Sequence, residues 1–188
     1  MTWGNRRGFL CCVMTAWAAV SGGRGLAQDP PKADGQEFRS AEGNFLLWLP
    51  AGPEEISADR CPPAAKVWQA SGPASLTLVQ FGFVGGQQRM EGDAIDASLE
   101  GLARETAEIL KGSLVSTKKI TLGRWPGREL RIRFSAGEIR MCLLERMFRV
   151  GDTRLFVRIM VPEEESSLSE HRKVLDSFKL IDESRESR

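Results

Sequence analysis

The stretch from residue 114 to residue 161 constrains the fold more than any other part of the sequence. Apolar and polar residues alternate along 128–135 and 153–161, as in strands that place one face on a core. Gly151-Asp152 is a two-residue pair that typically closes a type II′ hairpin. The sequence therefore predicts four strands, the last three of them forming an antiparallel meander, at residues 114–122, 128–135, 139–150 and 153–161.

Shorter strand signals precede this stretch. Residues 45–50 are apolar on both sides of the alternation, which predicts a strand buried on both faces and ended by Pro50. Residues 66–69 predict a short strand, and residues 75–83 predict a longer one that runs into a glycine-rich loop. Between residues 122 and 128, one proline and two glycines predict a turn.

Two segments have helical periodicity. From Asp93 an apolar stripe recurs at helical spacing, with Asp93 expected as the N-cap and Gly112 expected as the left-handed residue that ends the helix after Lys111. A second helix is expected after the acidic residues 163–165, where Ser167-x-x-Glu170 has the spacing of a capping box. Its expected inner stripe comprises Leu168, His171, Val174, Leu175 and Phe178.

Four local patterns together resemble the PsbP-like family of exported domains. They are Ser40-x-Glu42-Gly43-x-Phe45 running into Pro50, Pro126-Gly127-Arg128-Glu129, the strand pair around Gly151-Asp152, and Asp176-Ser177-Phe178-Lys179-Leu180. The resemblance covers residues 38–181 and implies one α+β domain, an α/β/α sandwich in which a central antiparallel β-sheet is flanked by helices. Members of that family include non-enzymatic assembly factors, and relatives of the fold bind a small GTPase. The matching residues lie mostly where strands and helices begin or end, so they indicate the fold, and no functional residue is carried over.

The N-terminus predicts export from the cytoplasm. Arg6 and Arg7 precede a short apolar segment, and the small-residue pattern before residue 28 predicts cleavage after Ala27. The paired arginines resemble the twin-arginine signal, and ordinary secretion is the alternative route. Residues 1–27 are thus expected to be a signal peptide, 28–37 a flexible leader and 182–188 a polar tail. The predicted location is periplasmic or secreted, with no stable membrane anchor after cleavage.

The net charge bears on the expected partners, and the cysteines bear on a possible disulfide. Removal of three arginines with the signal peptide leaves 23 basic against 25 acidic side chains, so nucleic acid is not an expected partner. Cys61 and Cys142 remain after cleavage. In an oxidising compartment they are candidates for a disulfide, and two separate apolar core residues are the alternative.

Catalytic motifs are missing from the sequence. His171 is the only histidine, and the sequence contains no Gly-x-Ser-x-Gly elbow, no Walker loop and no Cys-x-x-Cys. The acidic pairs near residues 54 and 163 lie at turns or a helix start, where acids are ordinarily solvated. We therefore expect a protein that is not an enzyme and that needs no cofactor or metal.

Two sets of residues are candidates for binding. Alternation places Arg131, Arg133, Arg154 and Arg158 on the strand faces away from the expected core, where they form either an anion-binding cluster or structural bridges to Glu129, Glu163 or Glu170. Arg124, Trp125 and Arg128 lie at the expected hairpin and are the better candidates for contact with a partner, unless Trp125 folds over the sheet edge.

The function expected from these observations is a non-enzymatic binding or assembly domain of the cell envelope that holds a protein partner. A carrier for a small apolar or anionic ligand, and an enzyme of unrecognised type, are the alternatives.

Overall fold

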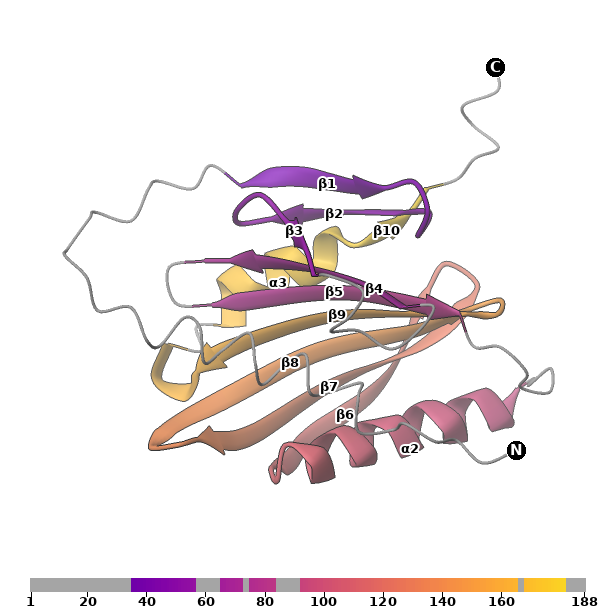
Figure 1. Ribbon diagram of the computed structural model, residues 1–188. Helices are drawn as coiled ribbons and strands as arrows, with labels where there is room; N and C mark the ends of the chain where they lie inside the picture. Colours follow the sequence, from indigo (N-terminus) through magenta and orange to yellow (C-terminus); the bar gives the residue numbers. More distant parts are fainter. Residues whose placement is uncertain (1–34, 57–64, 73–74, 84–91, 166–167, 182–188) are drawn as a thin grey trace, which may run out of the picture.

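A seven-stranded antiparallel sheet forms the centre of the molecule in the computed structural model, which describes residues 35–56, 65–72, 75–83, 92–165 and 168–181. Its strand order is β3-β4-β5-β9-β8-β7-β6. Figure 1 shows helix α2 on one face, and helix α3 with a second, small sheet on the other. The strands of the central sheet are β3 (Glu54–Glu55), β4 (Ala65–Ser71), β5 (Leu76–Phe83), β6 (Ser113–Leu122), β7 (Trp125–Ala136), β8 (Ile139–Val150) and β9 (Thr153–Pro162).

The predicted meander is confirmed and extends over four consecutive strands, β6 to β9. Each connection is a two-residue turn whose first residue is a glycine with positive φ, namely Gly123, Gly137 and Gly151. The broad turn expected between residues 122 and 128 is wrong, because β7 begins at Trp125. Gly127 is instead a strand residue where β8 approaches closely, since a Cβ there would lie 2.3 Å from Phe148 Cδ1.

Helix α2 (Asp93–Ile109) covers β6, β7 and part of β8. Leu99, Ala103 and Thr106 are buried on the side of α2 that faces the sheet, as the helical stripe predicts, whereas Ile109, expected in the same stripe, is 41% exposed. Both predicted caps need correction. Gly92 is the N-cap and no side chain caps it, while the left-handed residue at the C-terminus is Lys111, with φ of 50°, and not Gly112.

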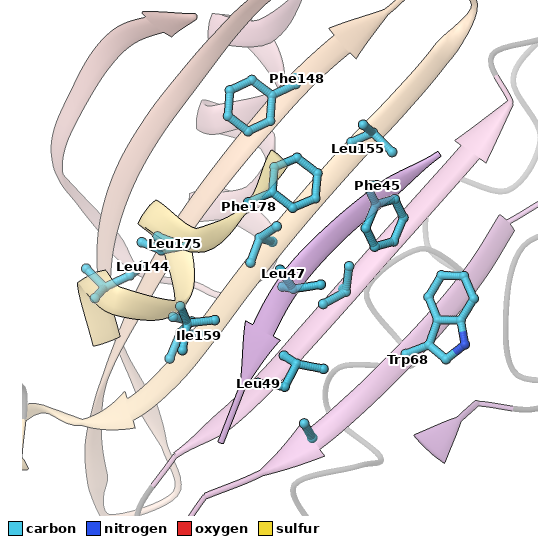
Figure 2. Packing of buried hydrophobic residues seen from close by; sticks show 14 of the residues in the cluster. Phe45, Leu47, Leu49, Trp68, Leu144, Phe148, Leu155, Ile159, Leu175 and Phe178 are labelled. Carbon is cyan, nitrogen blue, oxygen red and sulfur yellow. The ribbon is translucent and has the colours of Figure 1, made fainter. Parts of the chain in front are cut away.

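The opposite face of the central sheet carries a second core. It is covered by α3 (Leu168–Ser177), which follows the short helix η2 (Glu163–Glu165), and by the small sheet of β1 (Gln36–Ser40), β2 (Phe45–Leu49) and β10 (Lys179–Leu180). Figure 2 shows side chains from these layers meeting between them. Phe178 packs on Phe148 with ring centroids 5.7 Å apart and on Phe45 at 5.4 Å.

Strand β2 corrects one prediction. Phe45, Leu47 and Leu49 are buried, whereas Trp48 is 36% exposed, so β2 has one buried face and not two. The reason is that β2 lies in an outer layer, in a small sheet that the sequence analysis did not foresee. Strand β1 begins at Gln36, two residues before the predicted start of the domain at residue 38.

The predicted α+β class, with a central antiparallel sheet between helices, is confirmed. Within the described residues, no helix has the length and apolar character needed to cross a bilayer. Residues 1–27, with Arg6, Arg7 and the cleavage point after Ala27, lie outside the described residues, as does the tail at 182–188.

Candidate functional site

The tip of the β6–β7 hairpin is the most exposed of the predicted contact sites. Gly123 and Arg124 form the turn, and the guanidinium carbon of Arg124 lies 4.6 Å from the centroid of the Trp125 ring. Arg124 is exposed and Trp125 is half-buried. A cation stacked on an indole contributes about 0.5–1 kcal/mol at an exposed site, which favours one arrangement of the two side chains.

The β8–β9 hairpin ends beside the β6–β7 hairpin, and Figure 1 shows both tips at the same end of the sheet. Arg149 Nε donates a hydrogen bond to the Gly151 carbonyl oxygen at 2.6 Å, and the Arg149 guanidinium lies 3.6 Å from Asp152 Oδ1. The turn is therefore held by its own strand, and the exposed Asp152 carboxylate lies at its outer end. We call Arg124, Trp125 and Asp152 the hairpin end.

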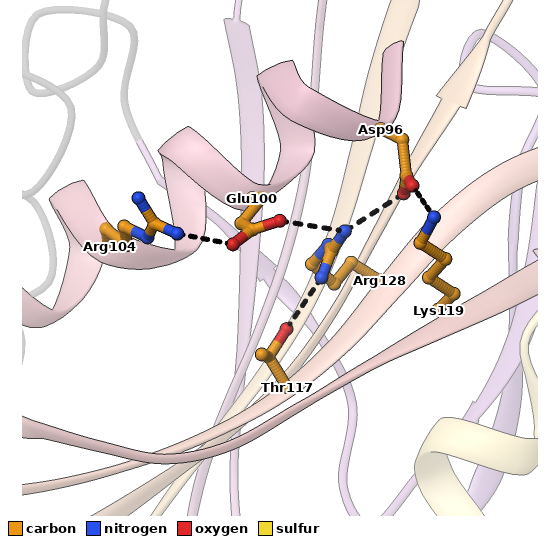
Figure 3. Close-up of polar contacts among 6 residues, drawn as sticks. All are labelled: Asp96, Glu100, Arg104, Thr117, Lys119 and Arg128. Carbon is orange, nitrogen blue, oxygen red and sulfur yellow. Dashed lines mark hydrogen bonds and ion pairs between the residues drawn. The ribbon is translucent and has the colours of Figure 1, made fainter. Parts of the chain in front are cut away.

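Arg128 does not belong to this surface, which corrects the prediction for that residue. It is 4% exposed and extends under α2, where its guanidinium contacts Asp96 at 2.9 Å and Thr117 Oγ1 at 3.1 Å. Figure 3 shows the whole group, in which Glu100 also approaches Arg128, at 3.6 Å. Arg128 therefore fixes the helix to the sheet and is not available to a partner.

Asp96 is the centre of that network. Its carboxylate accepts bonds from both Lys119 and Arg128. The hydrogen bond from Lys119, followed by the positive charges of Lys119 and Arg128, lowers the pKa of Asp96 below its ordinary value. Three elements, α2, β6 and β7, are joined through this one carboxylate.

The four arginines predicted to cluster are divided between the two faces of the sheet. Arg131 and Arg133 lie on the α3 side, because their cross-strand neighbours Leu144 and Cys142 belong to the second core. Arg154 and Arg158 lie on the α2 side and are buried. The anion-binding cluster is thus wrong, and the bridge from Arg133 to Glu163, at 2.7 Å, agrees with the alternative.

Arg158 is part of a buried polar group that the sequence analysis missed. Its Nε bonds to the Glu145 carboxylate and its Nη1 donates to Gln80 Oε1 at 2.8 Å. Glu145 is fully buried, and, in the part of the chain that the structure describes, its Oε1 and Gln80 Nε2 have no hydrogen-bond partner. The sequence contains one signal for this group. Glu145 lies at an alternating position of β8 whose other members, Met141, Leu143 and Met147, are apolar, so a buried carboxylate could have been predicted.

Arg154 lies further along the same face. Its guanidinium reaches Ser98 Oγ of α2 at 3.4 Å, and Arg149 is its direct cross-strand neighbour. Burial, followed by the charge of Arg149, lowers the pKa of Arg154 from its ordinary value. These contacts tie α2 to β9.

The remaining candidate residues do not gather into a site. Cys142 is buried, and its Sγ accepts a bond from Arg131 Nε at 3.2 Å. Cys61 lies outside the described residues, so the disulfide stays a prediction. His171 is half-buried on α3. The described residues contain no group of three or more histidine, cysteine or acidic side chains suited to a metal ion.

Comparison with known proteins gives similarity in structure and not in sequence. No family model and no curated protein matches the chain. Cyanobacterial PsbP from Synechocystis is similar in structure, with a TM-score of 0.60, 11% identity, and coverage of 84% of this chain and 98% of that one. The chain has a PsbP-like fold.

The Ran-binding protein Mog1p of Saccharomyces cerevisiae has a similar structure, with a TM-score of 0.50 and 14% identity over 81% of this chain and 98% of Mog1p. At such identities the similarity establishes the fold, and the partners of these proteins are not carried over. The resemblance expected from the sequence is therefore confirmed for the fold.

Proposed function

We propose that this protein is a non-enzymatic binding or assembly domain of the cell envelope, and that it holds a protein partner at the hairpin end. The observation that carries the proposal is the stacked pair of Arg124 and Trp125 at the tip of a two-residue turn. Arginine and tryptophan are enriched among the residues that dominate binding energy at protein interfaces. Two adjacent strands support the pair, so little conformational entropy is lost when a partner binds.

Two further considerations support the proposal. Mog1p, which has a similar structure, is by its name a protein that binds another protein, so this fold is compatible with such a role. The envelope location and export to the periplasm or beyond rest on Arg6, Arg7 and the cleavage pattern ending at Ala27.

The test is capture of a partner by the exported protein in its own envelope fraction, by cross-linking followed by mass spectrometry. We expect the variant that combines Arg124→Ala with Trp125→Ala to lose the cross-linked partner while its thermal unfolding stays cooperative. Trp48→Ala is the control, because Trp48 is an exposed indole on β2, in the other sheet. Undiminished capture by the double variant would contradict the proposal.

The second candidate, a carrier for a small ligand between sheet and helix, is favoured by one observation. Glu145 Oε1 and Gln80 Nε2 are a buried acceptor and a buried donor without partners among the described residues, and a ligand with both kinds of group would satisfy them. Native mass spectrometry of the protein purified from its own envelope should then show added mass that disappears on denaturation. A protein of bare mass would argue against the carrier.

A further inference from the structure

We infer that the outer edge of β6 receives an extended acidic segment of the protein partner as an additional strand. This inference rests on the proposed function, since β6 runs directly into the turn that carries Arg124. It adds the chemistry of the partner segment and the way in which it binds.

The first step is that β6 is an open edge in the described part of the chain. It is the last strand of the seven-stranded order and pairs with β7 only. In an edge strand, alternate residues direct their N–H and C=O groups away from the sheet, where another strand can pair with them. Addition of a strand at such an edge is a common mode of peptide recognition.

The second step is that the edge is regular over a useful length. The pairing with β7 shifts once, between Leu114 and Ser116, and then continues without interruption from Ser116 to Leu122. A bulge usually stops strand addition, so the receptive part begins at Ser116. Seven residues of strand have a length of about 23 Å, enough for a peptide of similar length.

The third step is that the edge carries charge of one sign. Between Lys111 and Arg124 the chain has four basic residues, Lys111, Lys118, Lys119 and Arg124, and no acidic residue. A second copy of β6 added antiparallel would bring lysines opposite lysines, which is unfavourable. An acidic strand would instead place carboxylates next to the lysines, which is favourable. The charge pattern therefore favours an acidic segment of another protein over self-association.

The fourth step gives the pattern of the bound segment. Thr117 and Lys119 lie on the α2 side of β6, because Thr117 pairs with Leu130 and Lys119 with Arg128. Ile120 and Leu122 lie on the other side, half-buried against the second core. A segment that alternates acidic with apolar residues therefore places its carboxylates near Lys119, whose ammonium group they share with Asp96, and its apolar side chains beside Ile120 and Leu122.

The probe for this inference is a seven-residue peptide of alternating glutamate and valine, acetylated and amidated, added to the isotope-labelled full-length protein. We expect amide shifts and slowed hydrogen exchange at Ser116 to Leu122. The same peptide with every backbone nitrogen methylated keeps its charge but has no backbone N–H donors on either edge, so it should not bind. Lys119→Gln should weaken binding about fivefold, as for loss of an exposed charge pair, whereas Lys118→Gln, on the opposite face of β6, should not. Lys173→Gln, at an exposed position on α3, is the matched control.

Several results would overturn the inference: no binding at millimolar peptide, equal binding of the N-methylated peptide, shifts at another surface, or β6 protection that grows with protein concentration and reveals self-pairing. Its failure is separable from failure of the proposed function. If partner capture depends on Arg124 and Trp125 while the peptide does not bind β6, only the further inference is lost. If the peptide protects β6 while capture ignores Arg124 and Trp125, only the proposed contact at the hairpin end is lost.

Discussion

At the scale of single residues, the fully buried Glu145 and its partner Arg158 are an ion pair in the otherwise apolar core between α2 and the central sheet. A buried ion pair contributes little net stability, but removal of one partner leaves the other charge without compensation. The alternation along β9 predicts that Arg158 faces solvent. In the structure both faces of the central sheet are covered, so each residue of β9 lies in one of the two cores.

Arg158→Met should lower the free energy of unfolding by about 3 kcal/mol, because Glu145 then stays buried without its partner. Adding Glu145→Leu should restore at least half of that loss, since no charge remains unpaired. Urea unfolding of the wild type, the single variant and the double variant measures both effects. A single variant as stable as the wild type would contradict this account.

The lowered pKa of Asp96 predicts that the stability of the fold depends on pH in the acidic range. Its pKa is lowered from the ordinary 3.8 in the folded protein, so its contribution is complete above that value and is lost as the pH falls through the lowered folded value. Asp96→Asn should therefore reduce the urea midpoint by more at pH 7 than at pH 2.5. Glu108→Gln, at an exposed position near the other end of α2, is the control. An Asp96→Asn difference that is equal at both pH values would contradict this account.

At the scale of elements, the end of α2 shows how the sequence misleads. Lys111 takes the left-handed conformation, while the N–H of Gly112 donates to the Ala107 carbonyl at 2.8 Å. Glycine is expected at the left-handed position, so the sequence pointed to Gly112. Gly112 is needed one residue later because a Cβ there would lie 2.5 Å from the carbonyl oxygen of Arg133. A close approach between distant segments leaves no local sequence signal.

A pair of substitutions tests this assignment. Lys111→Gly should raise the free energy of unfolding by about 1 kcal/mol, because glycine adopts positive φ without strain. Gly112→Ala should lower it by about 2 kcal/mol, because the new methyl group overpacks the contact with β7. Chemical unfolding of the two variants beside the wild type measures both signs. Signs opposite to these would contradict this assignment.

At the scale of the whole molecule, the sequence predicted the meander, both helices and the PsbP-like fold, but not the layer formed by β1, β2 and β10. Local alternation and turn glycines such as Gly151 encode the meander, because its pairings are between neighbours in sequence. The small sheet joins Phe45 of β2 to Leu180 of β10 across most of the chain. No local sequence pattern encodes such a pairing.

The hairpin end was partly predictable from the sequence, since Arg124 and Trp125 form the expected tip. The burial of Arg128 was not, because it depends on where α2 lies.

Truncation tests the contribution of the C-terminal layer. A chain ending at Ser177 loses Phe178, which packs on Phe148 and Phe45, and also loses β10. We expect its free energy of unfolding to fall by at least about 4 kcal/mol, as for deletion of a buried phenylalanine. A chain ending at Ile181 keeps every described contact and is the control. Near-UV circular dichroism and urea unfolding compare them, and equal stability of the two chains would contradict this role.

The pairing of β2 with β10 also has a consequence for the order of events during synthesis. Phe45 emerges from the ribosome long before Leu180, and Ile181 closes the contact through its bond to the Asn44 carbonyl at 3.0 Å. The second core is therefore completed only after residue 181 has been synthesised. An export route that accepts folded proteins would thus distinguish a chain that includes β10 from one that stops before it, because only the first can close the outer layer.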